Sequence, residues 1–180
     1  MRTNTNFGKT RNSGFTLIEL MVTLGVAAII LSVGVPSFRG VIMDNRLVSQ
    51  ANQFVTSVKM ARSAAVRYQR PATVCSSDDF NAAVPTCSGD PDWSDGWIVW
   101  VDKDRNGVTA ANEIISVFGP INESSTLSSA TSSSFTYDAR GFATTGGGDL
   151  TLCDSRTSEM GRLIKVNSVG RTNVARQGCS

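Results

Sequence analysis

The chain has 180 residues, a formal net charge of +2 and no histidine. The missing histidine excludes the Ser-His and Cys-His pairs that activate nucleophiles, and no motif of acid–base chemistry places the acidic residues. No glycine-rich loop follows a strand and opens a helix, so nucleotide binding has no support either. We therefore expect a protein that is not an enzyme, with room for one globular domain of ordinary size.

The first predicted element is an apolar helix. Residues 15–35 read FTLIELMVTLGVAAIILSVGV, a 21-residue run that is apolar except for two threonines, one serine and Glu19. This length is enough to span a bilayer as a helix. A charge at membrane depth costs about 2.5–3.5 kcal/mol on insertion scales. Glu19 therefore either lies near the helix end and reaches the interface, or has a dedicated role.

The segment before this helix is basic. Residues 1–14 contain Arg2, Lys9 and Arg11 but no acid, so the first residues should face the cytoplasm and the bulk of the chain should face out. An ordinary secretory signal has a shorter apolar region followed by a small-residue cleavage site, and no such site clearly follows here. Removal of these three positive charges would change the net charge from +2 to −1.

The string GFTLIEL, from Gly14 to Leu20, closely resembles the class III signal of type IV pilins and type II secretion pseudopilins. The resemblance implies that prepilin peptidase cuts between Gly14 and Phe15 and that Phe15 is then N-methylated. It implies that Glu19 neutralises the terminal amine of a neighbouring subunit during assembly. The implied partners are this peptidase, other major and minor pilins and the inner-membrane assembly platform. The implied location is the inner membrane, with a single pass and a periplasmic domain, and then the pilus fibre at the cell surface.

The helix should continue beyond the membrane segment. Apolar residues recur from Phe38 to Tyr68 with a 3.6-residue period and polar residues fill the other face, which predicts an amphipathic half over residues 36–70. Pro71 is expected to end it. Four positions inside the helix are expected weak points: Gly25, Gly34, Pro36 and Gly40.

From residue 71 onward the sequence changes to short β-branched or aromatic runs bounded by turn residues. Strands are predicted over residues 97–101, 113–118, 134–138, 150–153 and 163–167. The Ser/Thr- and Gly-rich segments 122–134 and 144–149 are predicted to be connecting loops. The expected fold is α+β and pilin-like, with a long N-terminal helix packed on a C-terminal antiparallel sheet. The expected parts are a cleaved leader (1–14), a transmembrane half-helix (15–35), an amphipathic half-helix (36–70) and a periplasmic domain (71–180).

Four cysteines lie in the β-rich part: Cys75, Cys87, Cys153 and Cys179. An even number in an exported domain favours two disulfides in an oxidising periplasm. Three pairings are open, and the sequential one, Cys75 with Cys87 and Cys153 with Cys179, closes the shortest loops. Metal binding by the cysteines is the weaker alternative, because no Cys-x-x-Cys motif is present.

A calcium-loop pattern follows the strand predicted at 97–101. Residues 102–113 satisfy D-x-[DN]-x-[DN]-G-x5-E. A plain hairpin turn explains the same residues, since strands rather than helices flank the loop and Lys103 and Arg105 reduce its negative charge. Both interpretations stay open, and Ca²⁺ is the one cofactor that the sequence suggests. Its ligands would be oxygen atoms of five residues: Asp102, Asp104, Asn106, Val108 (through its carbonyl) and Glu113.

The globular part resembles the FimT/FimU/GspH subgroup of minor pilins and pseudopilins. The similar features are GWIVWVD at 96–102, Asn106-Gly107, Gly141 after a strand, Cys153-Asp154, and Gly170-Arg171 before Cys179. The resemblance implies a minor type IV pilin, a structural subunit at or near the pilus tip that primes or supports assembly. Two alternatives remain, a DNA-binding minor pilin for natural transformation (FimT-like) and a minor pseudopilin of a type II secretion system (GspH-like).

The C-terminal charge pattern bears on the DNA alternative. Residues 139–180 carry six basic and three acidic side chains, and a basic patch attracts double-stranded DNA through its phosphates. The FimT type uses a G-R-x-R motif, of which only Gly170-Arg171 is present here. The candidate DNA-binding residues are Lys165, Arg171 and Arg176, and Arg67, on the polar part of the helix, is expected to lie outside this patch. Solvated surface residues or subunit contacts are the simpler explanation.

Overall fold

The computed structural model describes residues 14–145, 147–156 and 160–179. The expected leader therefore lies outside the described residues, except for Gly14. The chain divides into two compact units, residues 1–42 and 43–180, and each unit is described by itself.

A single long helix, α1 (Leu17–Tyr68), contributes to both units. It begins where Thr16 serves as the N-cap, since the Thr16 Oγ1 accepts a hydrogen bond from the backbone N–H of Glu19 at 3.3 Å. A Thr followed three residues later by a Glu is the pattern of a capping box. The helix is continuous through Pro36 and the glycines expected to weaken it, so none of these positions ends it.

The end of α1 has a local cause in the backbone. Gln69 takes a positive φ of 53°, and the N–H of Arg70 returns to the carbonyl of Ala65 at 3.3 Å. A residue in the left-handed region followed by such a backward hydrogen bond is a common helix terminator. Pro71, which cannot continue a helix, follows directly, as predicted.

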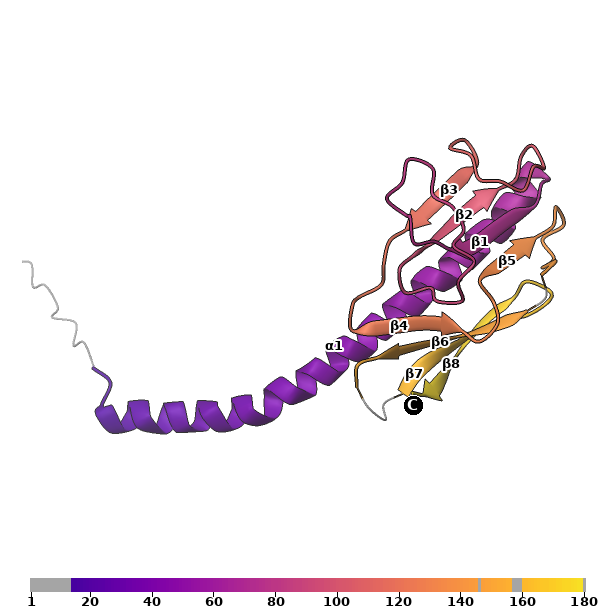
Figure 1. Cartoon of the computed structure of the whole chain (residues 1–180). Helices are drawn as coiled ribbons and strands as arrows, with labels where there is room; N and C mark the ends of the chain where they lie inside the picture. The colour runs from indigo at the N-terminus through magenta and orange to yellow at the C-terminus, as the bar shows by residue number, and fades with distance from the viewer. Residues whose placement is uncertain (1–13, 146, 157–159, 180) are drawn as a thin grey trace, which may run out of the picture. The chain divides into compact units, whose positions relative to one another are not determined.

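The rest of the chain forms two four-stranded antiparallel sheets (Figure 1). The strand order is β3-β2-β1-β5 in the first sheet and β4-β6-β7-β8 in the second. The strands of the first sheet are β1 (Ala72–Ser76), β2 (Trp97–Val101), β3 (Ile114–Phe118) and β5 (Ser134–Tyr137). Those of the second are β4 (Ser125–Ser129), β6 (Gly148–Asp154), β7 (Met160–Val166) and β8 (Thr172–Gly178).

The core lies between residues 47–65 of α1 and both sheets. One cluster of buried side chains joins this helix segment to β1, β2 and β5 and to β4, β6 and β7. Phe54 is at its centre and contacts Trp93 and Trp97 edge-on, with ring centroids 5.2 and 5.6 Å apart. Every described residue of this cluster belongs to the second unit, so residues 43–180 carry a complete core of their own. The expected α+β fold, with a long helix packed on antiparallel strands, is confirmed, and the strands form two sheets where one was expected.

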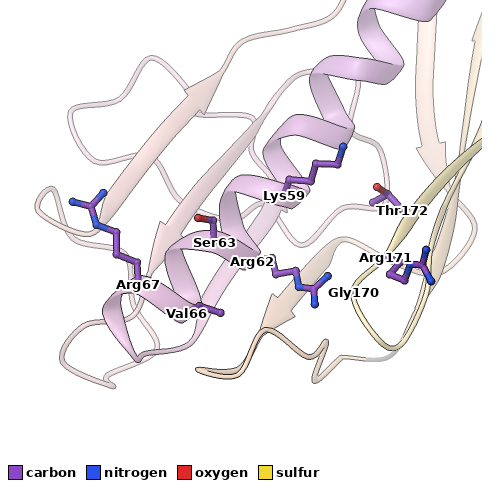
Figure 2. Close-up of a pocket in the computed structure, with 8 residues that line it drawn as sticks. All are labelled: Lys59, Arg62, Ser63, Val66, Arg67, Gly170, Arg171 and Thr172. Atoms are coloured by element: carbon purple, nitrogen blue, oxygen red, sulfur yellow. The ribbon is translucent and has the colours of Figure 1, made fainter.

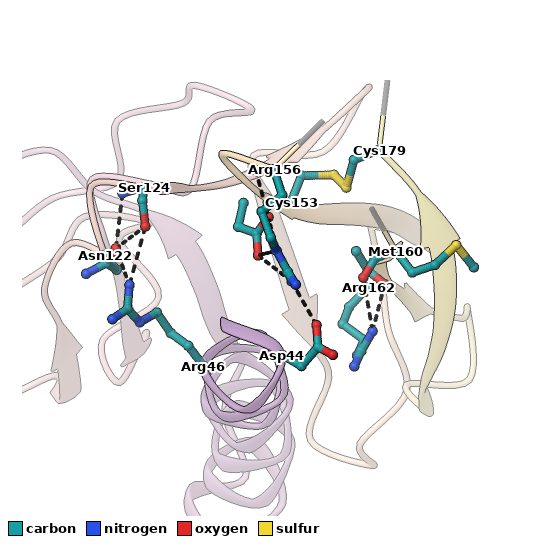
Figure 3. Close-up of polar contacts among 11 residues, drawn as sticks. Asp44, Arg46, Asn122, Ser124, Cys153, Arg156, Met160, Arg162 and Cys179 are labelled. Carbon is teal, nitrogen blue, oxygen red and sulfur yellow. Dashed lines mark hydrogen bonds and ion pairs between the residues drawn. A yellow bond between two sulfur atoms is a disulfide. The ribbon is translucent and has the colours of Figure 1, made fainter. Parts of the chain in front are cut away.

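An ion-pair cluster ties α1 to the second sheet (Figure 3). The Arg156 guanidinium lies 2.8 Å from Asp44 on α1 and 2.7 Å from Asp154 at the end of β6. The hydrogen bond from Arg156 holds the pKa of Asp154 below its usual value. Arg46 also reaches out of the helix and donates to the Asn122 side chain at 2.9 Å.

Three strands were not predicted: β1, β4 and β8. The segment 122–134, expected to be only a connector, contains β4, so that expectation was wrong. Its burial alternates, with Leu127 buried between exposed neighbours, but a single apolar residue among serines is too weak a signal to predict a strand. What makes it a strand is tertiary, because all five of its residues pair with β6.

Two disulfides cross-link the β-rich part of the chain, Cys75–Cys87 and Cys153–Cys179. This is the sequential pairing. The second bridge joins β6 to the residue after β8, and Gly161 lies beneath it. A Cβ at Gly161 would come within 2.5 Å of the Cys179 sulfur, so only glycine leaves room for the bridge at this point.

Candidate functional site

The first unit presents a largely apolar surface. Every large apolar side chain from Phe15 to Val35 is exposed, Phe15 to 79%. The helix is long and apolar enough to cross a membrane, judged by length and composition. Gly14 and Phe15 precede the helix, and Glu19 is an acid in its first turn. The expected cleavage position and the expected assembly carboxylate therefore lie within six residues at one end of this apolar surface.

A basic pocket lies beside the C-terminal part of α1, residues 59–67, in the second unit (Figure 2). Its volume is about 600 Å³, within the range of ligand pockets. Four of its lining side chains are positively charged, and none of the four makes an ion pair among the described residues. The lining residues are Lys59, Arg62, Ser63, Val66, Arg67, Gly170, Arg171 and Thr172.

A tight turn before β8 brings Arg171 to this pocket. The Asn167 side chain accepts a hydrogen bond from the Arg171 N–H at 2.7 Å, and the Asn167 carbonyl accepts one from the Gly170 N–H at 2.8 Å. Gly170 has a φ of +76°, and a Cβ there would come within 2.7 Å of the Tyr137 ring. Only glycine meets both conditions, which explains physically why Gly170 precedes Arg171.

The three expected DNA-binding residues do not all lie on one surface. Lys165 and Arg171 line a second, smaller pocket of about 330 Å³, and Lys165 is paired with Asp149 at 3.4 Å. Arg176 on β8 pairs directly with Arg162 on β7, and Arg162 is three residues before Lys165 on the same strand. Since side chains alternate between the faces of a sheet, Lys165 and Arg176 lie on opposite faces. Arg176 is therefore not the partner that completes a patch with Arg171 and Lys165.

The helix supplies the basic side chains that the sequence analysis did not assign. Lys59, Arg62 and Arg67 line the pocket with Arg171, but the Arg67 guanidinium points away from Arg62 and Arg171 (Figure 2). That Arg67 takes no part in DNA binding stays a prediction. Lys59 and Arg62, three residues apart, are neighbours on the helix surface, whereas Arg67, five residues after Arg62, lies about 140° around the helix from it. That spacing is a signal in the sequence, but their closeness to the turn at Gly170 is not.

The expected calcium ligands converge in part. Carboxylate oxygens of Asp102, Asp104 and Glu113 lie within 4.8 Å of one another. Asn106 donates a hydrogen bond from its Nδ2 to Asp104 Oδ2 at 2.8 Å, and its Oδ1 accepts one from the Val108 N–H at 2.7 Å. The loop is also the connection between the antiparallel strands β2 and β3, as the hairpin interpretation expects.

Comparisons with known proteins agree with this architecture. Residues 9–35 match the prokaryotic N-terminal methylation motif, and residues 50–170 match the family described as type II transport protein GspH. A search of curated proteins found no significant match.

Two solved structures of the type IV minor pilin FimU from Pseudomonas aeruginosa strain PAO1 are similar in fold. The crystal form in space group P21 aligns with a TM-score of 0.55 and 19% identity, covering 77% of this chain and 96% of that one. The form in space group P65 aligns with a TM-score of 0.50 and 18% identity, covering 73% and 96%. At this identity the likeness concerns the fold, and the family match spans two thirds of the chain. The chain therefore belongs to the GspH family, and it combines a prepilin-type N-terminal methylation motif with a pilin-like fold.

Proposed function

We propose that this chain is a minor pilin, a structural subunit at or near the tip of a type IV pilus that primes or supports its assembly. The observation that carries the proposal is the exposed apolar surface of residues 15–35 with one carboxylate, Glu19, in the first turn of the helix. Such a surface is stable when lipid or other helices cover it. The methylation motif over the same residues supports membrane insertion followed by assembly.

The proposed sequence of events starts in the inner membrane. Prepilin peptidase removes residues 1–14 by cutting between Gly14 and Phe15, and Phe15 is N-methylated. The new amine at Phe15 and the carboxylate at Glu19 then lie at similar membrane depth. An unpaired charge in hydrocarbon is costly, so the amine of one subunit is a favourable partner for Glu19 of another. The proposed partners are other pilins and the inner-membrane assembly platform, and the proposed role is structural rather than catalytic.

Substitution of Glu19 tests this proposal. We expect Glu19→Ala and Glu19→Gln to be cleaved normally, seen as the gel shift of leader removal, but to be strongly depleted from sheared fibres. The helix cap should survive both changes, because Thr16 bonds to the backbone N–H of residue 19. Glu123→Gln removes an exposed carboxylate from the globular unit and is the matched control. Normal amounts of Glu19→Ala in purified fibres would refute the proposed role.

The family description makes a type II secretion pseudopilus the alternative fibre. Deletion of the gene distinguishes the type IV pilus from the pseudopilus. Loss of surface pili with normal exoprotein secretion supports the pilus, and loss of secretion with normal pili supports the pseudopilus.

The basic pocket favours a second candidate function, binding of double-stranded DNA through its phosphates. Lys59, Arg62, Arg67 and Arg171 line one pocket, and their positive charge would attract a phosphate there. This cluster has more positive charge than the patch expected from the C-terminal residues alone.

Gel-shift titration of residues 43–180 against duplex DNA tests this function. We expect affinity to fall steeply with salt, because each neutralised phosphate releases counterions. Arg62→Ala and Arg171→Ala should each weaken binding and flatten the salt dependence, whatever the DNA sequence. Arg46→Gln removes one positive charge elsewhere on the same helix and should leave binding unchanged. Binding that survives in the Arg62→Ala/Arg171→Ala double variant would refute a role for this pocket.

A further inference from the structure

The loop between β2 and β3 buries negative charge without a matching cation. Glu113, at the end of this loop, is only 2% exposed. Oxygens of Asp102, Asp104 and Glu113 lie within 4.8 Å of one another. None of the three carboxylates makes an ion pair with a lysine or arginine among the described residues. Burial of a carboxylate is unfavourable unless it is paired or coordinates a metal.

Hydrogen bonds within the loop satisfy only part of this charge. Glu113 Oε1 accepts a hydrogen bond from the Lys103 N–H at 2.7 Å, and Asp102 Oδ2 accepts one from the Gly107 N–H at 3.2 Å. The other oxygen of each carboxylate, Glu113 Oε2 and Asp102 Oδ1, is buried and has no hydrogen-bond partner in the described part of the chain. Unpartnered buried polar atoms are rare in folded proteins, and an ion is one of their established explanations.

The backbone of the loop holds these side chains in place. Asp104 Oδ1 accepts a hydrogen bond from the Asn106 N–H at 3.1 Å, and Gly107 has a φ of 75°, which glycine adopts without strain. The cationic side chains of the loop are engaged elsewhere or exposed. Lys103 Nζ bonds to the Asn112 carbonyl and lies 5.2 Å from the centre of the Tyr68 ring, while Arg105 is exposed.

We propose that the loop from Asp102 to Glu113 binds one Ca²⁺ ion. The two unpartnered oxygens, Glu113 Oε2 and Asp102 Oδ1, supply ligands to it together with Asp104 and Asn106. The donors are all oxygens and come from one loop, which suits Ca²⁺, whereas Mg²⁺ demands a stricter octahedral arrangement and retains its waters. Three carboxylates beside two basic residues place the affinity in the weak class of extracellular modules, with Kd of roughly 10⁻⁴–10⁻³ M.

The position of the loop indicates what the ion would stabilise. The Asp102 N–H bonds to the Pro71 carbonyl at 2.9 Å, and the Arg70 guanidinium donates to the Lys103 carbonyl at 3.1 Å. The loop thus holds the segment that follows α1 against the β2–β3 hairpin. A bound ion stabilises the state that binds it, so calcium should strengthen the junction between the helix end and the first sheet. This inference does not depend on which fibre the chain enters.

Binding is tested with the full chain in detergent micelles after removal of metals. Terbium, a luminescent calcium mimic, should bind and emit when tryptophan is excited, and calcium should displace it at millimolar concentration. The unfolding temperature should rise with calcium and much less with an equal concentration of magnesium. Asp104→Asn, at an exposed position that should not disturb folding, and Glu113→Gln should each lower calcium affinity at least about tenfold, because affinity follows the ligand charge.

Glu123→Gln is the matched control, since it removes one exposed carboxylate outside the loop and should bind calcium like the unaltered chain. Three results would overturn the proposal: no calcium uptake by the folded chain at millimolar concentration, equal binding of magnesium and calcium, or unchanged affinity in both loop variants. Circular dichroism of each variant without metal distinguishes lost binding from lost folding.

Discussion

The Cys153–Cys179 disulfide should contribute a large share of the stability of the second unit. In the chain-entropy account, a cross-link stabilises by restricting the unfolded chain, and the effect grows with the length of the closed loop. The two cysteines are 26 residues apart, which corresponds to about 3.5 kcal/mol at 25 °C. We therefore expect the Cys153→Ala/Cys179→Ala variant of residues 43–180 to lose about 3.5 kcal/mol in free energy of unfolding.

The loss should be concentrated at the C-terminus. Five of the seven residues of β8 are exposed and the other two are half-buried. The strand pairs only with β7 among the described strands, so few buried contacts hold it once the bridge is removed. Urea denaturation followed by tryptophan fluorescence measures the global change, and amide hydrogen exchange over residues 172–178 measures the local one. The exchange rates of β8 should rise more than those of β6, which lies inside the sheet.

Reduction of the unaltered protein provides the control. A reducing agent should destabilise it at least as much as the double substitution, while the variant should respond only through its remaining Cys75–Cys87 bridge. A loss below about 1 kcal/mol, with β8 as protected as before, would refute the reasoning. It would mean that strand pairing alone holds the C-terminus.

Two further predictions concern the core and the ion-pair cluster. Phe54→Ala removes the fully buried ring at the centre of the aromatic cluster and should lower the free energy of unfolding by about 3–5 kcal/mol, measured by denaturant titration. A loss below about 1 kcal/mol would contradict the central place of Phe54 in the core. Arg156 lowers the pKa of Asp154 in the folded state. The ionised Asp154 therefore stabilises the fold fully at a pH above its unfolded pKa of about 3.9, and this stabilisation is lost as the pH falls through the folded pKa. The stability difference between the unaltered protein and Asp154→Asn should therefore shrink between pH 6 and pH 3, and thermal unfolding that gives a constant difference would contradict this assignment.

Local signals in the sequence predicted much of the fold. The β2 bounds match the predicted range of 97–101, because a run of β-branched and aromatic residues is buried on both faces of the first sheet. The helix end matches within two residues, because Pro71 excludes continuation. β4 and β8 escaped prediction for the opposite reason, since Ser125–Ser129 and Thr172–Gly178 contain few apolar residues and become strands only by pairing with β6 and β7.

The sequence by itself determined the features that depend on neighbours in the chain: the apolar segment with Glu19, the GFTLIEL string from Gly14 to Leu20, the spacing of Asp102, Asp104 and Glu113, and the even number of cysteines. The tertiary structure alone decided which distant residues meet. It brought Lys59 and Arg62 to the same pocket as Arg171, set Lys165 and Arg176 on opposite faces of a sheet, and buried Glu113 Oε2 without a hydrogen-bond partner among the described residues. The physical reason is that strand register and helix packing decide these contacts, and both result from burial of a core shared by the whole second unit rather than from local propensity.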